Sequence, residues 1–202
     1  MQISVNKPQG KFLAMPDRIK YKAFVSGFGG GKTFVGCIQQ CLDYWRYPGI
    51  NQLYAAPTIP QIRDIYYPTI MQVSELMGLR VEVREGNKEV HFYEGRKYRG
   101  TTICRSMQIP ESIVGFKVGS ALVDEIDIMD AMKAERAWNK ILGRMRYENA
   151  TNRVSVTSTP EGYKFIYNRF VMNATERYGL VQASTYDNEL NLPPDYIESL
   201  AD

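Results

Sequence analysis

The feature that most constrains this chain is a cluster of glycines in SGFGGGKT, which spans residues 26–33. Glycine accepts backbone conformations that other residues avoid, so such a loop can turn several N–H groups toward one phosphate. Lys32 would then reach the β- and γ-phosphates of a nucleotide, and the hydroxyl of Thr33 would hold Mg²⁺. A glycine-rich turn can also be a plain loop, so this interpretation depends on what the rest of the chain supplies.

The segments on either side suit a phosphate-binding loop. Residues 21–25 predict a strand, and residues 32–45 predict a helix packed on a sheet through Phe34, Ile38, Leu42 and Trp45. The pattern GxxxxGK[ST] has glycine where this chain has Ser26; because serine is small and Gly27 can make the tight turn, we interpret the loop as a variant. The predicted nucleotide-binding residues are Ser26, Gly27, Phe28, Gly29, Gly30, Gly31, Lys32 and Thr33.

A second motif, SALVDEID at residues 120–127, predicts a buried strand that ends in Asp124 and Glu125. An aspartate there can hold Mg²⁺ through water, and the adjacent glutamate can orient an attacking water. An acidic pair often does no more than begin a solvated turn. Ligands of open α/β sheets bind at the carboxyl ends of the strands, where both motifs fall, so we predict a metal-binding Asp124 and a catalytic Glu125.

A third motif, VSVTSTPEG at residues 154–162, predicts a strand that ends in hydroxyl-bearing residues. Hydroxyls beside a γ-phosphate can sense its loss and pass the change to a moving element. Such residues also satisfy the backbone of ordinary turns. Because this strand follows the acidic pair along the chain, we predict a coupling role for Thr157, Ser158, Thr159 and Pro160.

Strands and helices alternate along the chain. Further strands are predicted within residues 51–58, 119–127, 153–160 and 178–185, with helices at 131–146 and 161–172. This order predicts an α/β P-loop NTPase fold of the RecA-like type, with a mainly parallel central sheet flanked by helices. Residues 79–105 predict a β-hairpin insertion before the acidic-motif strand. Residues 59–78 show a helical pattern that Pro68 should break or kink.

Other chemistries find little support in the sequence. The three cysteines (Cys37, Cys41, Cys104) and His91 form no pattern of metal ligands, and we interpret the cysteines as small buried residues in a reducing cytoplasm. No stretch has the length and apolar character of a membrane helix, so no membrane partner is expected. The formal net charge of +3 permits DNA contact without arguing for it.

The series SGFGGGKT, YAAPTIPQIRDI, SALVDEID, SVTSTPEG and STYDNELNLPPDYIESL resembles the N-terminal ATPase domain of the large terminase subunit of tailed bacteriophages. The resemblance implies a motor that hydrolyses ATP, with Mg²⁺, to move double-stranded viral DNA into a procapsid. It also implies a homo-oligomeric ring docked on the portal protein, working with a small terminase subunit in the host cytoplasm. Carried over to this chain, Lys32 and Thr33 bind phosphate and Mg²⁺, Asp124 holds Mg²⁺, Glu125 activates water, and Gln9 and Phe12 contact adenine.

The chain departs from this family in two ways. Many large terminases carry an arginine in the phosphate loop where this chain has Phe28, so the arginine that stabilises the transition state would come from elsewhere, including a neighbouring subunit. The candidates are Arg105, Arg144 and Arg146, although each could instead pair with a surface carboxylate. The family also continues into a nuclease domain. We therefore expect residues 1–185 to form the ATPase domain, residues 186–202 to start a linker toward a nuclease domain absent from this chain, and no DNA cleavage.

The sequence leaves two alternative functions and one question about DNA contact open. The DEID segment also fits the DExD pattern of superfamily 2 helicases, which need a second motor half. A nucleotide-binding assembly module without hydrolysis is the other alternative, although it would not need Glu125. DNA contact is predicted least clearly: Arg96, Lys97 and Arg99, near Tyr93 and Tyr98, could grip phosphates or form a solvated hairpin tip.

Overall fold

The computed structural model describes residues 3–199, which form an eight-stranded sheet in the order β3-β4-β5-β2-β6-β7-β1-β8. The strands β5, β2, β6, β7, β1 and β8 run parallel, whereas β4 is antiparallel to both β3 and β5. Their bounds are β1 Tyr21–Ser26, β2 Gln52–Ala56, β3 Arg80–Arg84, β4 Glu89–Glu94, β5 Lys97–Ser106, β6 Ser120–Asp124, β7 Arg153–Ser158 and β8 Tyr178–Ala183. Only β7 lies between the strand that precedes the glycine loop and the strand that ends in the acidic pair.

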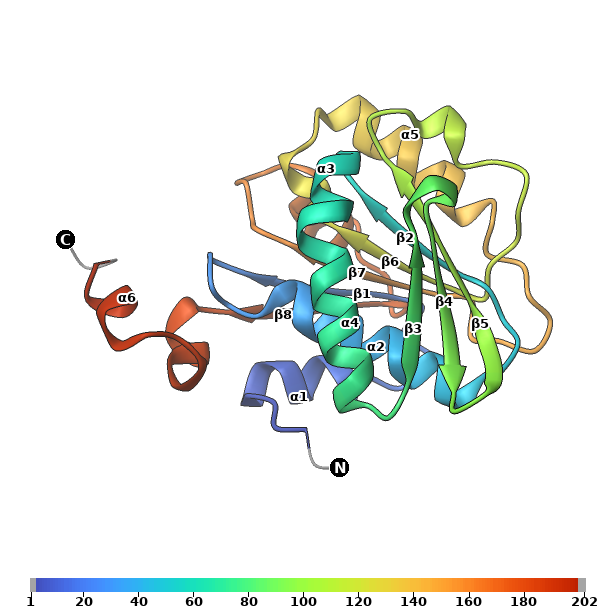
Figure 1. Cartoon of the computed structure of the whole chain (residues 1–202). Helices are drawn as coiled ribbons and strands as arrows, with labels where there is room; N and C mark the ends of the chain where they lie inside the picture. Colours follow the sequence, from blue (N-terminus) through green and yellow to red (C-terminus); the bar gives the residue numbers. More distant parts are fainter. Residues whose placement is uncertain (1–2, 200–202) are drawn as a thin grey trace.

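Helices cover both faces of this sheet (Figure 1). The α-helices are α1 Lys7–Leu13, α2 Lys32–Arg46, α3 Ile59–Gln61, α4 Tyr67–Leu76, α5 Ala131–Leu142 and α6 Pro194–Glu198. On one face, α5 places Trp138 in a core with alternate residues of the central strands, including Ala121 and Val123 of β6. On the other, α2 and α4 pack on Leu122 and Tyr54. Because side chains alternate along a strand, Asp124 falls on the α2 face, the side on which Thr33 begins its helix.

The α/β fold with a mainly parallel sheet is confirmed, and several local predictions need correction. The prediction of which α2 residues pack on the sheet is partly wrong. Leu42 is 38% exposed, while Cys37, Cys41 and Tyr44 are fully buried. The sheet and α4 enclose α2 so widely that even the polar Gln40 is buried. The last strand of the predicted hairpin region, β5, also joins the central sheet by pairing in parallel with β2.

Two segments predicted to be helical contain π-helical turns, which are wider than those of a regular α-helix. Pro68 does not end the helix, because the π-helical segment Ile62–Tyr66 precedes α4 and the N–H of Tyr67 donates to the carbonyl of Ile62. The proline then occupies the first turn of α4, where its missing N–H is tolerated. The helix predicted at 161–172 is π-helical over Tyr167–Met172. The short helix α1, capped by Asn6, was not predicted. Within residues 3–199 no helix is both long and apolar enough to cross a membrane.

A buried lysine ties together the elements that carry the glycine loop. The Nζ of Lys22, on β1, donates to the carbonyl of Phe12 at 3.0 Å and to Gln39 Oε1 at 2.5 Å. Gln39 in turn donates to Asp43, one turn further along α2, at 2.9 Å. Burial lowers the pKa of Lys22 to about 7, helped by the charge of Arg153, while the nearby Asp43 carboxylate opposes the shift.

This pKa predicts how stability changes with pH. Between the folded pKa of about 7 and the unfolded value near 10.5, the unfolded chain binds more protons at Lys22, so the free energy of unfolding gains a term that rises with pH. We expect Lys22→Met to lose this term, on the order of 3 kcal/mol between pH 6 and pH 9, relative to the wild type. Urea unfolding of both proteins from pH 6 to pH 9, with the exposed Lys11→Met as control, measures it. A difference between Lys22→Met and wild type that stays constant with pH would contradict the prediction.

Candidate functional site

The glycine loop, residues 27–31, joins β1 to α2 in a conformation that depends on its glycines. Gly29 and Gly31 both have φ of 71°, in the left-handed region that glycine tolerates best. A Cβ on Gly30 would lie 2.0 Å from Ser26 Oγ, so residue 30 must also be glycine. Ser26 itself is buried at the end of β1 and donates to the carbonyl of Gly27 at 3.2 Å. The serine in place of the usual glycine therefore fits this loop because Gly30 leaves space for it.

Lys32 connects the loop to the acidic pair. Its Nζ donates to the carbonyl of Gly27 at 3.0 Å and lies 3.6 Å from Glu125 Oε1. Its side chain is 8% exposed, so this positive charge is held almost entirely inside the site. A phosphate group seated on the N–H groups at the start of α2 would meet both the lysine and the positive end of the helix dipole.

Asp124 is a buried carboxylate held by three hydroxyl groups. Thr33 Oγ1 and Tyr54 OH donate to its Oδ2 at 3.0 and 2.9 Å, and Thr157 Oγ1 donates to its Oδ1 at 2.7 Å. Burial raises its pKa and the charge of Glu125 raises it further, while the hydrogen bonds from Thr157, Tyr54 and Thr33 oppose the shift. These hydroxyls come from α2, β2 and β7, so the carboxylate joins three elements around the end of β6.

The oxygen donors at this point fit Mg²⁺. Thr33 and Asp124 offer a hydroxyl and a carboxylate, the hard ligands that this ion prefers. Among residues 3–199 no group of three or more His, Cys, Asp or Glu side chains could enclose a metal. Mg²⁺ held here would therefore keep waters and phosphate oxygens as its other ligands, as it commonly does beside a nucleotide.

Glu125 has a strained backbone and a fixed carboxylate. Its φ is 51°, and its N–H donates to the carbonyl of Thr157 at 2.7 Å. A left-handed conformation costs a non-glycine residue free energy, and such strain is concentrated at functional sites. The Glu125 carboxylate accepts the N–H of Thr159 at 2.8 Å and its hydroxyl at 3.2 Å. The strain turns this side chain toward Lys32 rather than along the strand.

The end of β7 contacts both carboxylates. Thr157 bonds to Asp124, whereas Ser158 Oγ and Thr159 bond to Glu125, with Ser158 Oγ at 3.5 Å from Oε2. Pro160 is exposed and makes no such bond among the described residues. The four residues predicted for coupling thus lie beside the acidic pair, and three of them touch it.

Sequence reasoning assigned no role to Asp127, which joins the loops after β6 and β7. It is fully buried and accepts the N–H of Glu161 at 2.9 Å and of Ile166 at 2.8 Å. Its own N–H donates to Ser158 Oγ at 3.2 Å. Asp127 therefore connects the segment that follows the acidic pair to the segment that follows β7 through hydrogen bonds. The DEID motif contained the residue, but only the fold shows what its carboxylate holds.

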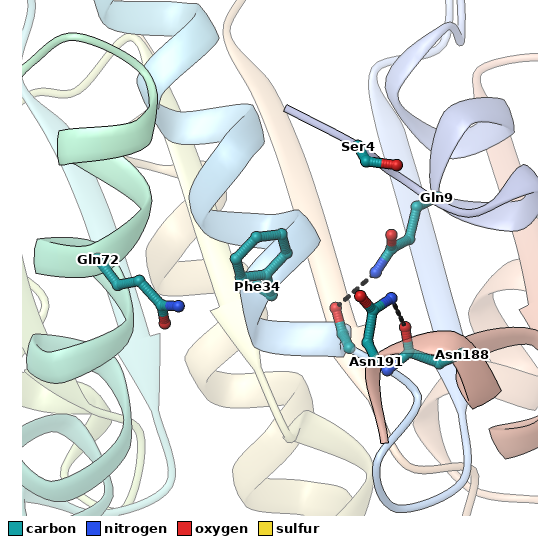
Figure 2. Close-up of a pocket in the computed structure, with 7 residues that line it drawn as sticks. Ser4, Gln9, Phe34, Gln72, Asn188 and Asn191 are labelled. Carbon is teal, nitrogen blue, oxygen red and sulfur yellow. Dashed lines mark hydrogen bonds between the residues drawn. The ribbon is translucent and has the colours of Figure 1, made fainter. Parts of the chain in front are cut away.

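Two adjoining cavities extend along the loop. One, of about 340 Å³, is lined by Gly29, Gly30, Gly31, Lys32, Thr33, Phe34, Thr69, Gln72 and Glu125. The other, of about 360 Å³, is lined by Ser4, Gln9, Gly31, Phe34, Gln72, Asn188 and Asn191, whose side chains surround it in Figure 2. They share Gly31, Phe34 and Gln72. The arrangement suits phosphates on the loop and an aromatic base among amides and one phenyl ring.

Of the two residues predicted to contact adenine, Gln9 lines the second cavity and Phe12 does not. Gln9 lines the second cavity, with its Oε1 accepting the N–H of Asn6 and its Nε2 donating to the carbonyl of Gly31 at 3.3 Å. Phe12 is fully buried and packs on Phe24, so it lies in the core and does not line the cavity. The other lining residues, Phe34, Gln72, Asn188 and Asn191, were not predicted, because they reach this place from α2, α4 and the segment after β8.

None of the three candidate arginines lies beside the loop of its own chain. Arg105 donates to the carbonyls of Ser112 and Cys104 and lines a separate cavity. Arg144 and Arg146 exchange backbone hydrogen bonds with Val118, which precedes β6 and so lies at the opposite edge of the sheet from Asp124. This placement sets Arg144 and Arg146 at the amino ends of the strands, away from the glycine loop and the acidic pair of the same molecule.

The basic hairpin turn needs one correction. Arg99 is buried, with 8% of its side chain exposed; it donates to the carbonyl of Trp45 at 3.1 Å and pairs with Glu94 at 3.4 Å. Its guanidinium also stacks over the Trp45 ring. Arg99 therefore suits neither of the two roles considered for it, a phosphate contact or a solvated tip, because its buried guanidinium holds β5 against α2. Arg96 and Lys97 are exposed at the turn.

Comparisons with known proteins show the family and the fold. A family model described as "Terminase large subunit, T4likevirus-type, N-terminal" matches residues 23–202. The large terminase of a thermophilic bacteriophage superposes with a TM-score of 0.80 at 17% identity, over 98% of this chain and 50% of that one. The complex of the same terminase with ADP gives a TM-score of 0.82 at 18% identity, over 97% of this chain and 49% of that one.

The ATPase domain of the Thermus phage P74-26 large terminase gives a TM-score of 0.70 at 15% identity, over 96% of this chain and 87% of that one. No curated protein sequence matches the chain significantly. At these identities the solved structures show a shared fold. The chain spans about half the length of the first of these large terminases.

The contact between Ser26 and Gly30 predicts a mutational rescue. Gly30→Ala brings a methyl group into Ser26 Oγ, so we expect the loop to open and ADP affinity to fall by roughly tenfold or more, a loss on the scale of an overpacked site. Adding Ser26→Gly removes that oxygen and should restore most of the affinity. Titration with a fluorescent ADP analogue measures both variants. A double variant as weak as Gly30→Ala would show that the clash is not the cause.

Proposed function

Because the chain belongs to the family of N-terminal domains of terminase large subunits of the T4-like type, we propose that it is an ATP-hydrolysing motor domain that moves double-stranded viral DNA into a procapsid. The observation that carries the proposal is the placement of Lys32, Thr33, Asp124 and Glu125 around one cavity at the carboxyl edge of the sheet. Nucleotide binding is further supported by the fold shared with the thermophilic bacteriophage terminase, which has been solved with ADP and with ATP-gamma-S.

Each residue of this site has a separate task in hydrolysis. The loop N–H groups and Lys32 orient the phosphates, and Thr33 with Asp124 would hold Mg²⁺, which neutralises charge that develops on the phosphates. The Glu125 carboxylate accepts a proton from the attacking water, for which it must exchange part of its present contact with Lys32. Its second contact, with Thr159, then changes with it, and Asp127 carries that change to the segment after β7.

The transition state still needs a positive charge beyond Lys32. Since Arg144 and Arg146 lie at the far edge of the sheet and Arg105 bonds to local carbonyls, we propose that an arginine enters from a neighbouring subunit of a homo-oligomeric ring. A second chain that presents Arg105, Arg144 or Arg146 would complete the site. The portal protein and a small terminase subunit are the proposed assembly partners, and the host cytoplasm at the portal is the proposed location.

Turnover of ATP against protein concentration tests the proposal. With Mg²⁺ we expect specific activity to rise steeply with concentration, because a ring brings the second arginine, and Lys32→Ala to lower it at least about 100-fold by removing the phosphate contact. The exposed Lys11→Ala is the matched control. Intact ATP-gamma-S binding without turnover at any concentration would favour the non-hydrolysing module instead. Full turnover that is independent of concentration would contradict the trans arginine, and stimulation by single strands would favour a helicase.

DNA binding by the hairpin turn has its own test. If Arg96 and Lys97 contact phosphates, replacing both by alanine should reduce the salt dependence of DNA binding by about two charges, without changing stability. Arg99→Ala should instead lower the free energy of unfolding by about 1–3 kcal/mol, since it leaves Trp45 and Glu94 without their partner. Fluorescence anisotropy across salt concentrations and urea unfolding separate the two effects. An unchanged salt slope for the double variant would identify the turn as a solvated tip.

A further inference from the structure

The carbonyl groups of the glycine loop are held from outside the loop. Asn188 Nδ2 donates to the carbonyl of Gly29 at 2.7 Å, and Thr185 Oγ1 donates to that of Phe28 at 2.8 Å. A loop whose N–H groups point inward at a phosphate turns its carbonyls outward, so these need donors on the outer side. Side chains more than 150 positions away in the sequence supply them.

Ser26, Lys32 and Gln9 hold the carbonyls at the two ends of the loop, Gly27 and Gly31, whereas the middle of the loop has little else to fix its shape. Phe28 is 72% exposed, Gly29 is exposed, and glycines retain the most backbone freedom of all residues. Within the loop, one backbone hydrogen bond joins the N–H of Gly30 to the carbonyl of Gly27 at 3.3 Å. The two side-chain bonds from the segment after β8 are shorter than this internal one. These two bonds therefore fix much of the backbone conformation in the middle of the loop, at Phe28 and Gly29.

Asn188 is itself rigidly oriented. It is 7% exposed, and its Oδ1 accepts Asn191 Nδ2 at 2.9 Å and Asn6 Nδ2 at 3.4 Å, which leaves its Nδ2 facing the loop. Figure 2 shows Asn188 and Asn191 together below the cavity, opposite Gln9. The turn that presents them, Thr185–Asn191, starts directly after β8 with a capping box between Ser184 and Asp187. Because β8 pairs with β1, this turn begins beside the loop.

The same segment also packs tightly on the loop. A Cβ on Gly27 would lie 2.8 Å from Thr185 Oγ1, and a Cβ on Gly29 would lie 3.1 Å from Tyr196 and 3.2 Å from Leu192. Thr185, Asn188, Leu192 and Tyr196 thus all face the loop, at spacings of three, four and four residues. In Figure 1 this segment leaves the sheet beyond β8 and ends in α6 at the edge of the molecule.

We propose that Thr185 and Asn188 are positioning residues that hold the phosphate loop in its binding shape, so that the segment 184–199 and the nucleotide site control each other. The proposal deepens the proposed function, on which it rests for the identity of the ligand. Coupling of this kind is reciprocal: a nucleotide that orders the loop stabilises the docked segment, and undocking the segment weakens nucleotide binding by the same factor. A change of nucleotide would therefore change the docking of this segment directly, without acting through the end of β7.

The first test uses the protein without nucleotide. Amide hydrogen exchange of residues 27–31 is measured in wild type, Asn188→Ala, Thr185→Val and Thr185→Ser. We expect roughly fivefold faster exchange in Asn188→Ala and Thr185→Val, the scale of one lost hydrogen bond, and near wild-type exchange in Thr185→Ser, which keeps the hydroxyl. Asn173→Ala, which removes another amide-to-carbonyl bond far from the loop, is the matched control. Equal loop exchange in wild type and Thr185→Val would overturn the proposal even if Asn188→Ala failed to fold.

The second test adds ADP and ATP-gamma-S. We expect both ligands to slow exchange of residues 184–199 in wild type, and Asn188→Ala to raise their Kd about fivefold to tenfold and to abolish that protection. Because Asn188 also lines the second cavity, Thr185→Val, whose side chain lines neither cavity, should raise the Kd as well if positioning is the cause. The effect should fall on KM more than on kcat, because the side-chain hydrogen bonds of Asn188 go to Gly29, Asn191 and Asn6 and not to Lys32 or Glu125. A segment whose exchange ignores bound nucleotide would refute the coupling. A wild type that binds neither ligand would instead refute the proposed function, while the nucleotide-free measurement would still decide the positioning role.

Discussion

The Asp124 carboxylate, held by Thr33, Tyr54 and Thr157, is the contact on which the site depends. It gathers the first turn of α2, the middle of β2 and the end of β7 around the end of β6. Burying a carboxylate is costly unless several donors surround it, and three hydroxyls do so here. The same hydroxyl and carboxylate oxygens lie beside the phosphate loop, where they would hold Mg²⁺. The hydrogen bonds that stabilise the buried charge therefore lie at the proposed metal site.

The strand order places the end of β7 where it can respond to a change at the acidic pair. With β7 alone between β1 and β6, its last residues touch both acidic side chains, and Asp127 ties the next segment to them. On the other side of β1, the segment after β8 holds the carbonyls of the loop. We therefore propose that two segments flank one nucleotide site and respond to it: the end of β7 through Glu125, and the segment after β8 through the shape of the loop.

Sequence predicted the parts of the site that are local in the chain. The glycine loop follows β1 and leads into Lys32 and Thr33, while Asp124 ends β6 and Glu125 follows it. The carboxyl ends of parallel strands share one edge of the sheet. It missed Tyr54, Asp127 and Asn188, because their roles arise from strand order and from the return of the chain beside β1. Arg99 was misjudged for the same reason, since its partners lie on α2 and β4. The π-helical turn before Pro68 depends on packing that a helical pattern does not contain.

The central claim is that Glu125 activates water while Asp124 and Lys32 serve binding. The most direct measurement is the affinity for ATP-gamma-S together with single-turnover ATP hydrolysis in Glu125→Gln, which keeps the shape of the side chain and its place beside Thr159. We expect an affinity within about threefold of wild type and hydrolysis at least about 100-fold slower, the usual contribution of a general base. Hydrolysis at the wild-type rate would contradict it and would place the base elsewhere in the site.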